Sequence, residues 1–387
     1  MERTEYLNTI TTEFAINPVV AILGPRQCGK TTLARTFIKS SPNFNQANYF
    51  DLEDPTHLDR LQNNPKLSLS LLSGLVVIDE IQRVPELFTL IRVLVDDENL
   101  NLTFLILGSA SKELIRQSSE TLAGRISTIE ITPFSLHETK EQKLLWLRGG
   151  FPKSYLANTE EISFNWRKSY ISTFLERDIP ELGIQIDPQN LRRFWMMIAH
   201  YHGNIINMSE VGNSLSISHT TVKRYLDVLT GTFMIRQLKP WFANISKRQV
   251  KQPKIFIRDS GILHNLLSIK DENSLLLHPK LGASWEGMAL EQVINIFKAD
   301  PQDCYFWGVH NQGELDLMII KDGKKIGFEF KFSQTGKLTP SMKMAITNLE
   351  LDSLNIVVPL DTHYPLDTNI NVIGLINLEK TLLSSTP

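Results

Sequence analysis

The sequence has few cysteines and no long apolar run. Its 387 residues include two cysteines, Cys28 and Cys304, which lie far apart and lack the spacing of a metal site. This scarcity excludes a disulfide-rich scaffold and a cysteine-ligated zinc module, and it leads us to expect a reducing, cytoplasmic setting. No apolar stretch reaches the roughly 18 residues of a membrane-spanning helix, and the first residues do not resemble a secretory signal. We therefore expect no membrane partner.

The sequence also lacks an excess of either charge. Lys and Arg number 40 and Asp and Glu number 42, which gives a net charge of −2. A generally basic nucleic-acid-binding surface is excluded, so any such partner must be met by a local patch. The length predicts two or three domains.

The most informative stretch is a glycine-rich loop near the amino terminus. An apolar run at 18–23 is followed by the pattern G-x-x-x-x-G-K-T and then by a helix-forming segment at 32–38. Backbone N–H groups of such a loop and helix start bind the phosphates of a nucleotide such as ATP. An ordinary glycine-rich turn is the alternative, which the strand–loop–helix context disfavours. The residues expected around the nucleotide are Gly24, Pro25, Arg26, Gln27, Cys28, Gly29, Lys30, Thr31 and Thr32.

Within this loop, two side chains have specific expected roles. Lys30 would reach the β- and γ-phosphates, and the Thr31 hydroxyl would hold Mg²⁺.

Four further apolar runs predict an open parallel sheet. The runs at 74–79 and 102–107 are continuous, as expected for strands covered on both faces, and a helix is predicted at 85–95 between them. Ligands of such sheets bind at the carboxyl ends of the strands. The four runs are 47–52, 74–79, 102–107 and 126–131.

Polar residues follow these predicted strands. Asp79 is expected to complete the Mg²⁺ shell through water, and Glu80 to orient and deprotonate the attacking water. The alternative is that both acids cap the next helix. Ser109 is expected to contact the γ-phosphate or its water, or else to cap a helix starting at Lys112. Arg125 is expected either to reach a neighbouring copy's nucleotide in an oligomer or to be a surface arginine in a turn.

The middle of the chain predicts a helix-turn-helix. Helices are expected at 191–199, 209–215 and 217–226, the last capped by Ser218, with a wing strand at 233–238. The following stretch, 239–258, is basic and could contact DNA phosphates. A lid or interdomain connector that never touches DNA is the alternative. The basic residues are Lys239, Lys247, Arg248, Lys251, Lys254 and Arg258, and the histidines His200, His202 and His219 are interpreted as ordinary polar residues.

The carboxyl-terminal third predicts an acidic pocket. A helix at 285–297 precedes a hairpin that turns at 321–324, and strand alternation places Glu329 and Lys331 on one face. Asp316 on the preceding strand and Glu286 on the helix are expected beside them.

This order resembles the PD-(D/E)xK nuclease fold. In it, Asp316 and Glu329 would bind a divalent metal, preferably Mg²⁺, and Lys331 would position or activate the hydrolytic water, with Glu286 completing the catalytic set. A salt-bridged Glu329–Lys331 face on a non-catalytic sheet is the alternative.

The motifs taken together resemble the bacterial and archaeal AAA-type ATPases of the AAA_14/DUF4143 group. The resemblance implies an α/β chain in which a P-loop NTPase parallel sheet is followed by a winged-helix-like module and a nuclease-like domain of unproven activity. The expected boundaries are 1–140 for the ATPase domain, 141–190 for a helical linker, 191–260 for the winged-helix-like module and 261–387 for the nuclease-like domain. The motifs are those at 24–32, 78–82, 107–111, 122–125, 132–138, 149–152, 177–179 and 254–261.

We therefore expect an Mg²⁺-dependent, ATP-hydrolysing protein whose nucleotide state controls the later modules. Through these modules the protein could act on DNA. The alternatives are an ATP-controlled binding switch and a protein-interaction platform, both without nuclease activity.

Overall fold

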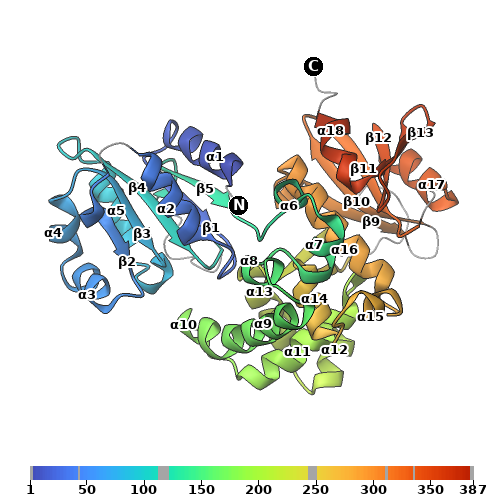
Figure 1. Cartoon of the computed structure of the whole chain (residues 1–387), viewed down its shortest axis with the longest axis horizontal. Helices are drawn as coiled ribbons and strands as arrows, with labels where there is room; N and C mark the ends of the chain where they lie inside the picture. Colours follow the sequence, from blue (N-terminus) through green and yellow to red (C-terminus); the bar gives the residue numbers. More distant parts are fainter. Residues whose placement is uncertain are drawn as a thin grey trace. The chain divides into compact units, whose positions relative to one another are not determined.

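The computed structural model describes residues 3–41, 44–111, 122–242, 251–309, 313–333 and 336–383 (Figure 1). The chain forms two compact units that do not follow the order of the sequence. The first unit is built from 1–133, 172–187 and 227–234, and the second from 134–171, 188–226 and 235–387. The two later segments of the first unit were not predicted from the sequence.

The described part of the first unit contains a five-stranded sheet in the order β2-β3-β4-β1-β5. Every neighbouring pair is parallel, which confirms the predicted open parallel sheet. The second strand is shorter than predicted because 46–48 form a 3-10 turn capped by Asn45. The strands are β1 (Val19–Leu23), β2 (Tyr49–Asp51), β3 (Gly74–Asp79), β4 (Leu102–Gly108) and β5 (Ile126–Glu130).

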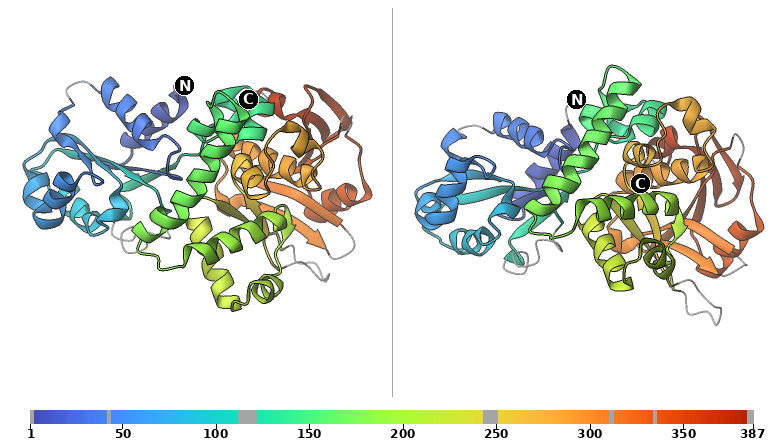
Figure 2. Two further views of the ribbon diagram at one scale, coloured as in Figure 1. Left: turned by 60° about the horizontal axis from the view of Figure 1, so that its bottom comes forward. Right: turned by 90° about the horizontal axis from the view of Figure 1, so that it is seen from below.

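Helices cover both faces of this sheet (Figure 1, Figure 2). Val20 and Ile22 of β1 pack in one apolar cluster, and the alternate residues Val19 and Ala21 pack in another. Helices α1 (Thr4–Phe14) and α2 (Lys30–Ser40) contribute to the first cluster. The second cluster includes residues of α3 (Pro55–Asn63), α4 (Pro65–Ser70) and α5 (Leu87–Val95). Burial on both faces explains why these strands are continuously apolar.

The second unit has a sheet of nine strands among its described residues, in the order β13-β14-β12-β11-β10-β9-β7-β8-β6. The predicted turn between β10 and β11 is confirmed: Asp322 and Gly323 both have positive φ, as a two-residue type I′ hairpin turn requires. The strands are β6 (Asn204–Ile205), β7 (Ile235–Pro240), β8 (Lys254–Ile257), β9 (Cys304–Val309), β10 (Gly313–Lys321), β11 (Lys324–Phe330), β12 (Ser353–Val358), β13 (His363–Asp367) and β14 (Ile370–Gly374).

One end of this sheet is formed by strands that alternate with helices. The order along the chain is α11 (Pro188–Tyr201), β6, α12 (Met208–Leu215), α13 (His219–Gly231), β7 and β8. Both β6 and β7 pair antiparallel with β8. The strand predicted at 233–238 is β7, and it also pairs in parallel with β9, so it belongs to the large sheet rather than to a free wing.

Long helices cover the two faces of the other end of the sheet. Residues of α16 (Leu281–Phe297) pack with Leu317 and Phe328 on one face, and residues of α17 (Pro340–Leu349) pack with Met318 on the other. The remaining helices of the unit are α6 (Leu136–Thr139), α7 (Gln142–Arg148), α8 (Pro152–Tyr155), α9 (Glu160–Thr173, which continues to the first unit), α14 (Ser260–Leu266), α15 (Glu272–Leu276) and α18 (Leu378–Leu383). Among the described residues, no helix combines the length and apolarity needed to cross a membrane.

Candidate functional site

The predicted phosphate loop connects β1 to α2. Gly29 has φ 103°, a conformation that side chains rarely adopt, and it lies directly before the first residue of α2. At Gly24, an added Cβ would lie 2.2 Å from the carbonyl oxygen of Ile131. Both glycines are therefore required by the backbone, as the motif predicts.

Lys30 lies over this loop. Its side chain is almost fully buried, and its Nζ donates hydrogen bonds to the carbonyl oxygens of Gly24 and Pro25, both at 2.9 Å. A protonated amine that is held against the loop is suited to bind phosphate oxygens at the same place.

Thr31 and Asp79 lie together at the carboxyl ends of the strands. The hydroxyl of Thr31 donates to Asp79 Oδ2 at 2.8 Å, and the hydroxyl of Tyr49 donates to the same oxygen at 3.0 Å. Burial raises the pKa of the Asp79 carboxyl, and the neighbouring Glu80 raises it further. Hydroxyl and carboxylate oxygens are the ligand types that Mg²⁺ prefers, so this pair fits the ion expected from the sequence.

Glu80 is held by two neighbours. Its φ of 58° is unusual for a residue with a side chain. The hydroxyl of Ser109 donates to Glu80 Oε2 at 3.1 Å and to Oε1 at 3.3 Å, and the amide nitrogen of Gln82 also donates to Oε2. Gln82 in turn accepts a hydrogen bond from the backbone N–H of Ser109 at 3.2 Å. The helix from Lys112, which Ser109 was expected to cap as an alternative, lies outside the described residues.

Arg26 of the loop is surrounded by carboxylates within the first unit. Its Nη1 donates to Asp178 Oδ1 at 2.6 Å and to Glu181 Oε2 at 2.7 Å, and its Nη2 donates to Glu53. Asp178 ends the π-helical turn η4 (Phe174–Asp178), and Glu181 ends α10 (Ile179–Glu181). Burial raises the pKa of Asp178 to about 6, against the opposing effect of the Arg26 charge.

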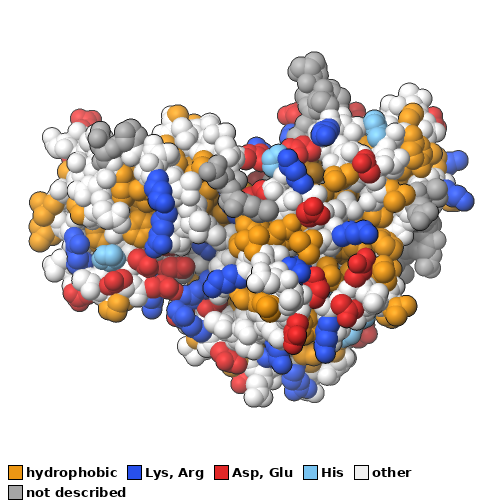
Figure 3. Space-filling view, viewed as in Figure 1, with side chains coloured by type: hydrophobic (Ala, Val, Ile, Leu, Met, Phe, Trp, Pro, Cys, Tyr) orange, Lys and Arg blue, Asp and Glu red, His pale blue; other side chains and the backbone are white. Residues whose placement is uncertain are grey.

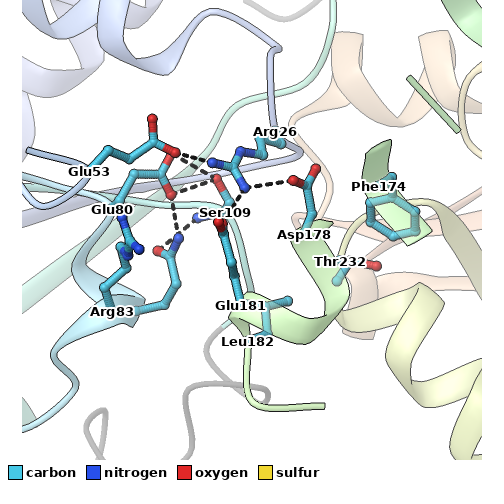
Figure 4. Close-up of a pocket in the computed structure, with 11 residues that line it drawn as sticks. Arg26, Glu53, Glu80, Arg83, Ser109, Phe174, Asp178, Glu181, Leu182 and Thr232 are labelled. Atoms are coloured by element: carbon cyan, nitrogen blue, oxygen red, sulfur yellow. Dashed lines mark hydrogen bonds and ion pairs between the residues drawn. The ribbon is translucent and has the colours of Figure 1, made fainter. Parts of the chain in front are cut away.

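These groups line one pocket of the first unit (Figure 4). Figure 4 shows Arg26 between Glu53 and Asp178, with Ser109 and Glu80 on the same side of the pocket. The pocket is thus lined both by the predicted catalytic residues Glu80 and Ser109 and by Glu181 of α10. The sequence did not lead us to expect α10 at this site. The only signal in the sequence was the motif at 177–179.

Arg125 lies at the edge of the sheet that is formed by β5. It directly precedes β5, and its carbonyl oxygen accepts a hydrogen bond from Val19, the first residue of β1. Its guanidinium pairs with Asp96, Nε to Oδ1 at 2.5 Å. Because the phosphate loop follows the opposite end of β1, Arg125 is far from the nucleotide site of its own chain. A role at a neighbouring copy's site stays a prediction.

The predicted acidic residues of the second unit do lie together. The register of β10 and β11, in which Leu317 pairs with Phe328, places Asp316 opposite Glu329. Lys331 Nζ lies 2.8 Å from Glu329 Oε2 and 3.9 Å from Asp316 Oδ2. The backbone N–H of Phe330 donates to Asp316 Oδ2 at 3.0 Å.

Burial and the repulsion between neighbouring carboxylates raise the pKa values of two acids in this cluster, Glu286 and Glu329. Burial raises the pKa of Glu286 to about 8 and that of Glu329 to about 8, and the charge of Asp316 adds to both shifts.

A lysine that the sequence analysis assigned elsewhere lies at the centre of the cluster. Lys254 is 2% exposed, and its Nζ lies 3.4 Å from Glu286 Oε1 and 3.4 Å from Asp316 Oδ1. It also forms an ion pair with Glu314. No group of three or more His, Cys, Asp or Glu side chains in the described ranges is arranged to hold a metal ion. The Mg²⁺ expected at Asp316 and Glu329 therefore does not fit this arrangement, because an ammonium lies among the carboxylates.

Two residues of the basic stretch at 239–258 are not placed to contact DNA as the sequence predicted. Lys254 is buried, and the Nε of Arg258 pairs with Glu291 Oε2 at 3.1 Å, so neither is free for a DNA phosphate. Lys239 and Lys251 are exposed. The predicted contacts from Lys247 and Arg248 lie outside the described residues. Over the face drawn in Figure 3, basic and acidic side chains are interspersed, as the small net charge suggests.

The first turns of α13 present polar side chains. Ser218 caps the helix as predicted, its Oγ accepting from the backbone N–H of Thr221 at 3.1 Å. The apolar side is buried through Val222 and Leu226. The exposed residues of this segment are Ser218, His219, Thr220, Lys223 and Arg224. The interpretation of His202 as an ordinary polar residue is too simple: it is buried, and its Nδ1 accepts from the backbone N–H of Ile257 at 2.9 Å.

Family models match nearly the whole chain in three consecutive parts. An AAA domain matches residues 16–140, a domain of unknown function (DUF8612) matches 139–273, and another domain of unknown function (DUF4143) matches 281–378. The phosphate loop lies in the part matched by the AAA domain. Lys254 lies in the second part, and the four acids around it lie in the third.

Relatives in bacteria cover most of the chain. Uncharacterized protein Rv2008c of Mycobacterium tuberculosis is 46% identical over 355 residues, which are 91% of this chain and 79% of that protein. An uncharacterized protein of Haemophilus influenzae is 23% identical over 304 residues, 70% of this chain and 75% of its own length.

Solved structures are more distant. The Walker-type ATPase PABY2304 of Pyrococcus abyssi has a TM-score of 0.47 at 17% identity and covers 69% of this chain and 95% of its own. The ORC1 protein of Aeropyrum pernix, solved in complex with DNA, has a TM-score of 0.34 at 13% identity, with 71% and 94% covered.

Proposed function

This chain belongs to the AAA-type P-loop ATPases of the AAA_14/DUF4143 group, and we propose that ATP binding and hydrolysis in its first unit switch the state of its second unit. The observation that carries the proposal is the pocket that Arg26 and Glu80 line together, in which Arg26 of the phosphate loop donates hydrogen bonds to the carboxylates of Asp178 and Glu181. One pocket thus holds Glu80 and Ser109, two of the residues expected for hydrolysis, together with a segment that leads into the other unit.

In this proposal, the loop and two side chains bind the nucleotide. Lys30 exchanges its carbonyl partners at Gly24 and Pro25 for phosphate oxygens. Thr31 and Asp79 hold Mg²⁺. Bound Mg²⁺ would neutralise charge on the β- and γ-phosphates as the bond between them breaks.

Glu80 is the proposed base for hydrolysis. Its carboxylate accepts a proton from the attacking water, whose oxygen bonds to the γ-phosphorus as ADP leaves. Ser109 and Gln82 orient that carboxylate through the hydrogen bonds described above. Both donate to Glu80 Oε2, whereas the contact of Ser109 with Oε1 is longer, at 3.3 Å, so Oε1 is the more available oxygen for the water.

The route to the second unit runs through Arg26. Segment 172–187 belongs to the first unit, yet the stretches on either side of it, 134–171 and 188–226, belong to the second. Triphosphate oxygens compete with Asp178 and Glu181 for the Arg26 guanidinium, because all are anionic acceptors. ATP binding therefore weakens the contacts that hold this segment, and hydrolysis followed by phosphate release restores them.

Phosphate release by the purified full chain with Mg²⁺ and ATP tests the first half of this proposal. We expect Lys30→Ala to abolish binding of a fluorescent ATP analogue, and Glu80→Gln to bind it normally but to lose turnover at least about a hundredfold. Glu98→Gln, at an exposed acid of the same unit, is the matched control and should keep wild-type turnover. Turnover retained in Glu80→Gln would disprove the assignment of the base.

DNA contact through α13 is a second candidate function. Helix, strand, two helices and a two-stranded hairpin follow one another in the order of a winged helix, and α13 exposes Lys223 and Arg224 near its start. Fluorescence anisotropy with a DNA duplex over a range of salt concentrations tests it. We expect Lys223→Ala with Arg224→Ala to reduce both the affinity and the salt slope, and Lys270→Ala, at an exposed lysine elsewhere in the unit, to change neither. A wild-type chain that binds no duplex would instead favour a protein partner.

A further inference from the structure

We propose that the ammonium of Lys254 takes the place of a divalent cation in the second unit, so that the nuclease-like carboxylate cluster binds no metal ion in the wild-type chain. The cluster consists of two lysines and four acids, and we call it the Lys254 cluster: Lys254, Lys331, Glu286, Glu314, Asp316 and Glu329. It lies entirely within the second unit, so this inference does not depend on the proposed ATP hydrolysis.

The position of the ammonium is the first argument. Lys254 Nζ contacts carboxylates from two separate elements: Glu286 comes from α16, and Glu314 and Asp316 come from β10. The side chain of Lys254 is almost fully buried, whereas half of the Glu314 side chain is exposed. A single positive charge therefore lies where several carboxylates converge, which is the place a metal ion would occupy.

The backbone of Lys254 is fixed on both sides. It is the first residue of β8, and it pairs with Ile205 of β6 and with Leu238 of β7. Its ammonium lies over the ring of Phe306, whose centroid is 5.7 Å from Nζ. The paired strands fix the Cα of Lys254, and the burial of its side chain, which is 3% exposed, confines the ammonium to the cluster. It is thus a built-in part of the site rather than a mobile counterion.

The second lysine cannot replace the first. Lys331 is 41% exposed and lies close to Glu329, at 2.8 Å, whereas its distance to Asp316 is 3.9 Å. No ion pair with Glu286 or Glu314 is found for Lys331 in the described residues. Removal of Lys254 therefore takes away the buried ammonium beside Glu286, Glu314 and Asp316 and leaves Asp316 with only its longer contact to the half-exposed Lys331. Several oxygen ligands for a hard divalent cation then lie near one another.

Binding of Mn²⁺ to the nucleotide-free full chain, followed by the electron paramagnetic resonance signal of free Mn²⁺, tests the inference directly. The proteins are the wild type, Lys254→Ala and the matched control Lys251→Ala, an exposed lysine three residues earlier. Each is measured with and without Asp316→Asn, so that any Mn²⁺ held near Thr31 and Asp79 is subtracted. We expect Asp316-dependent Mn²⁺ binding in Lys254→Ala and none in the wild type or in Lys251→Ala at Mn²⁺ concentrations up to about tenfold above the dissociation constant of Lys254→Ala.

Two results would overturn the inference. One is Asp316-dependent Mn²⁺ binding by the chain with Lys254 intact, seen as a difference between the wild type and Asp316→Asn, which shows that the ammonium does not occupy the metal position. The other is a folded Lys254→Ala that gains no such binding, which shows that the carboxylates cannot form a metal site. Because Lys254→Ala also removes a buried aliphatic chain, Lys254→Met, which keeps most of that volume without the charge, is made in parallel, and near-ultraviolet circular dichroism confirms that each variant is folded. For a folded Lys254→Ala or Lys254→Met we also expect added Mn²⁺ to raise the unfolding temperature, and the wild type to show no Asp316-dependent rise.

Discussion

Ser109 and Glu80 come from neighbouring strands of the first unit and meet at their carboxyl ends. The Ser109 hydroxyl donates to Glu80 Oε2 at 3.1 Å, and the backbone N–H of Ser109 donates to Gln82. Through these two contacts, the end of β4 sets the direction of the carboxylate that follows β3. Ser109 is thus a positioning residue for the proposed base.

Loss of the Ser109 hydroxyl should slow turnover without weakening nucleotide binding. In Ser109→Ala we expect kcat to fall about tenfold to a hundredfold, because Glu80 loses a partner that orients it, while KM for ATP changes little. Steady-state phosphate release measures both constants. Ser73→Ala, at an exposed serine of the same unit, should match the wild type. A rise in KM at unchanged kcat would instead indicate that Ser109 binds the nucleotide.

Asp178 should make the stability of the chain depend on pH. Burial raises its pKa from 3.8 to about 6 in the folded state, so its ionised form is less favourable there than in the unfolded chain. The free energy of unfolding should therefore fall by about 2 kcal/mol as the pH rises from about 4 through about 6. Urea unfolding over this range should show the decrease in the wild type and not in Asp178→Asn. An identical pH profile for both proteins would contradict the assigned environment.

Cys28 should resist alkylation despite its place in the phosphate loop. Its side chain has no exposed area, and burial raises the pKa of its thiol, so little thiolate is present. Cys304 is also buried, with its pKa raised to about 12 mainly by burial. Mass spectrometry after iodoacetamide treatment at neutral pH should find both thiols free in the native chain and both modified in urea. Rapid native labelling of Cys28 would show that the loop opens.

Glu291 should be important for the stability of the second unit. It is buried on α16 and accepts hydrogen bonds from both Arg236 and Arg258. Burial opposes its ionisation, yet these two arginines lower its pKa to about 2. Glu291→Gln removes the buried carboxylate that pairs with the largely buried side chains of Arg236 and Arg258, so we expect a loss of about 3 to 5 kcal/mol in the free energy of unfolding. Denaturant unfolding measures it, and Glu272→Gln, at an exposed acid, should cost almost nothing.

The pH dependence of Glu291 has the opposite sign to that of Asp178. Because its pKa is lowered in the folded state, its contribution to stability is complete above its usual value of 4.5 and is lost as the pH falls toward about 2. An acid titration of the wild type that showed no such loss would contradict the ion pairs with Arg236 and Arg258.

The first unit was largely predictable because its signals are local. Strand, loop and helix follow one another within 19–40, and the apolar runs of β3 and β4 reflect burial on both faces. The hairpin of β10 and β11 was predictable for the same reason, since its turn residues lie between two alternating strands. In such segments, nearby residues determine the backbone.

Lys254 and the partners of Arg26 could not be predicted in this way. Lys254 belongs to a basic stretch in the sequence, and only the pairing of β8 with β6 and β7, together with that of β7 with β9, brings it to Asp316. Arg26 and Asp178 are 152 positions apart. Both cases depend on long-range packing, which overrides the local charge pattern.

Hydrogen–deuterium exchange with and without ATP and Mg²⁺ tests the central claim most directly. Glu80→Gln is used so that ATP stays bound, and Lys30→Ala with Glu80→Gln is the control that binds none. We predict faster exchange with ATP at 174–182, where Arg26 releases Asp178 and Glu181, and altered exchange in the second unit at 134–171 or 188–226. Changes confined to the phosphate loop and the ends of β3 and β4 would contradict the account, because ATP would then bind without any effect on the second unit.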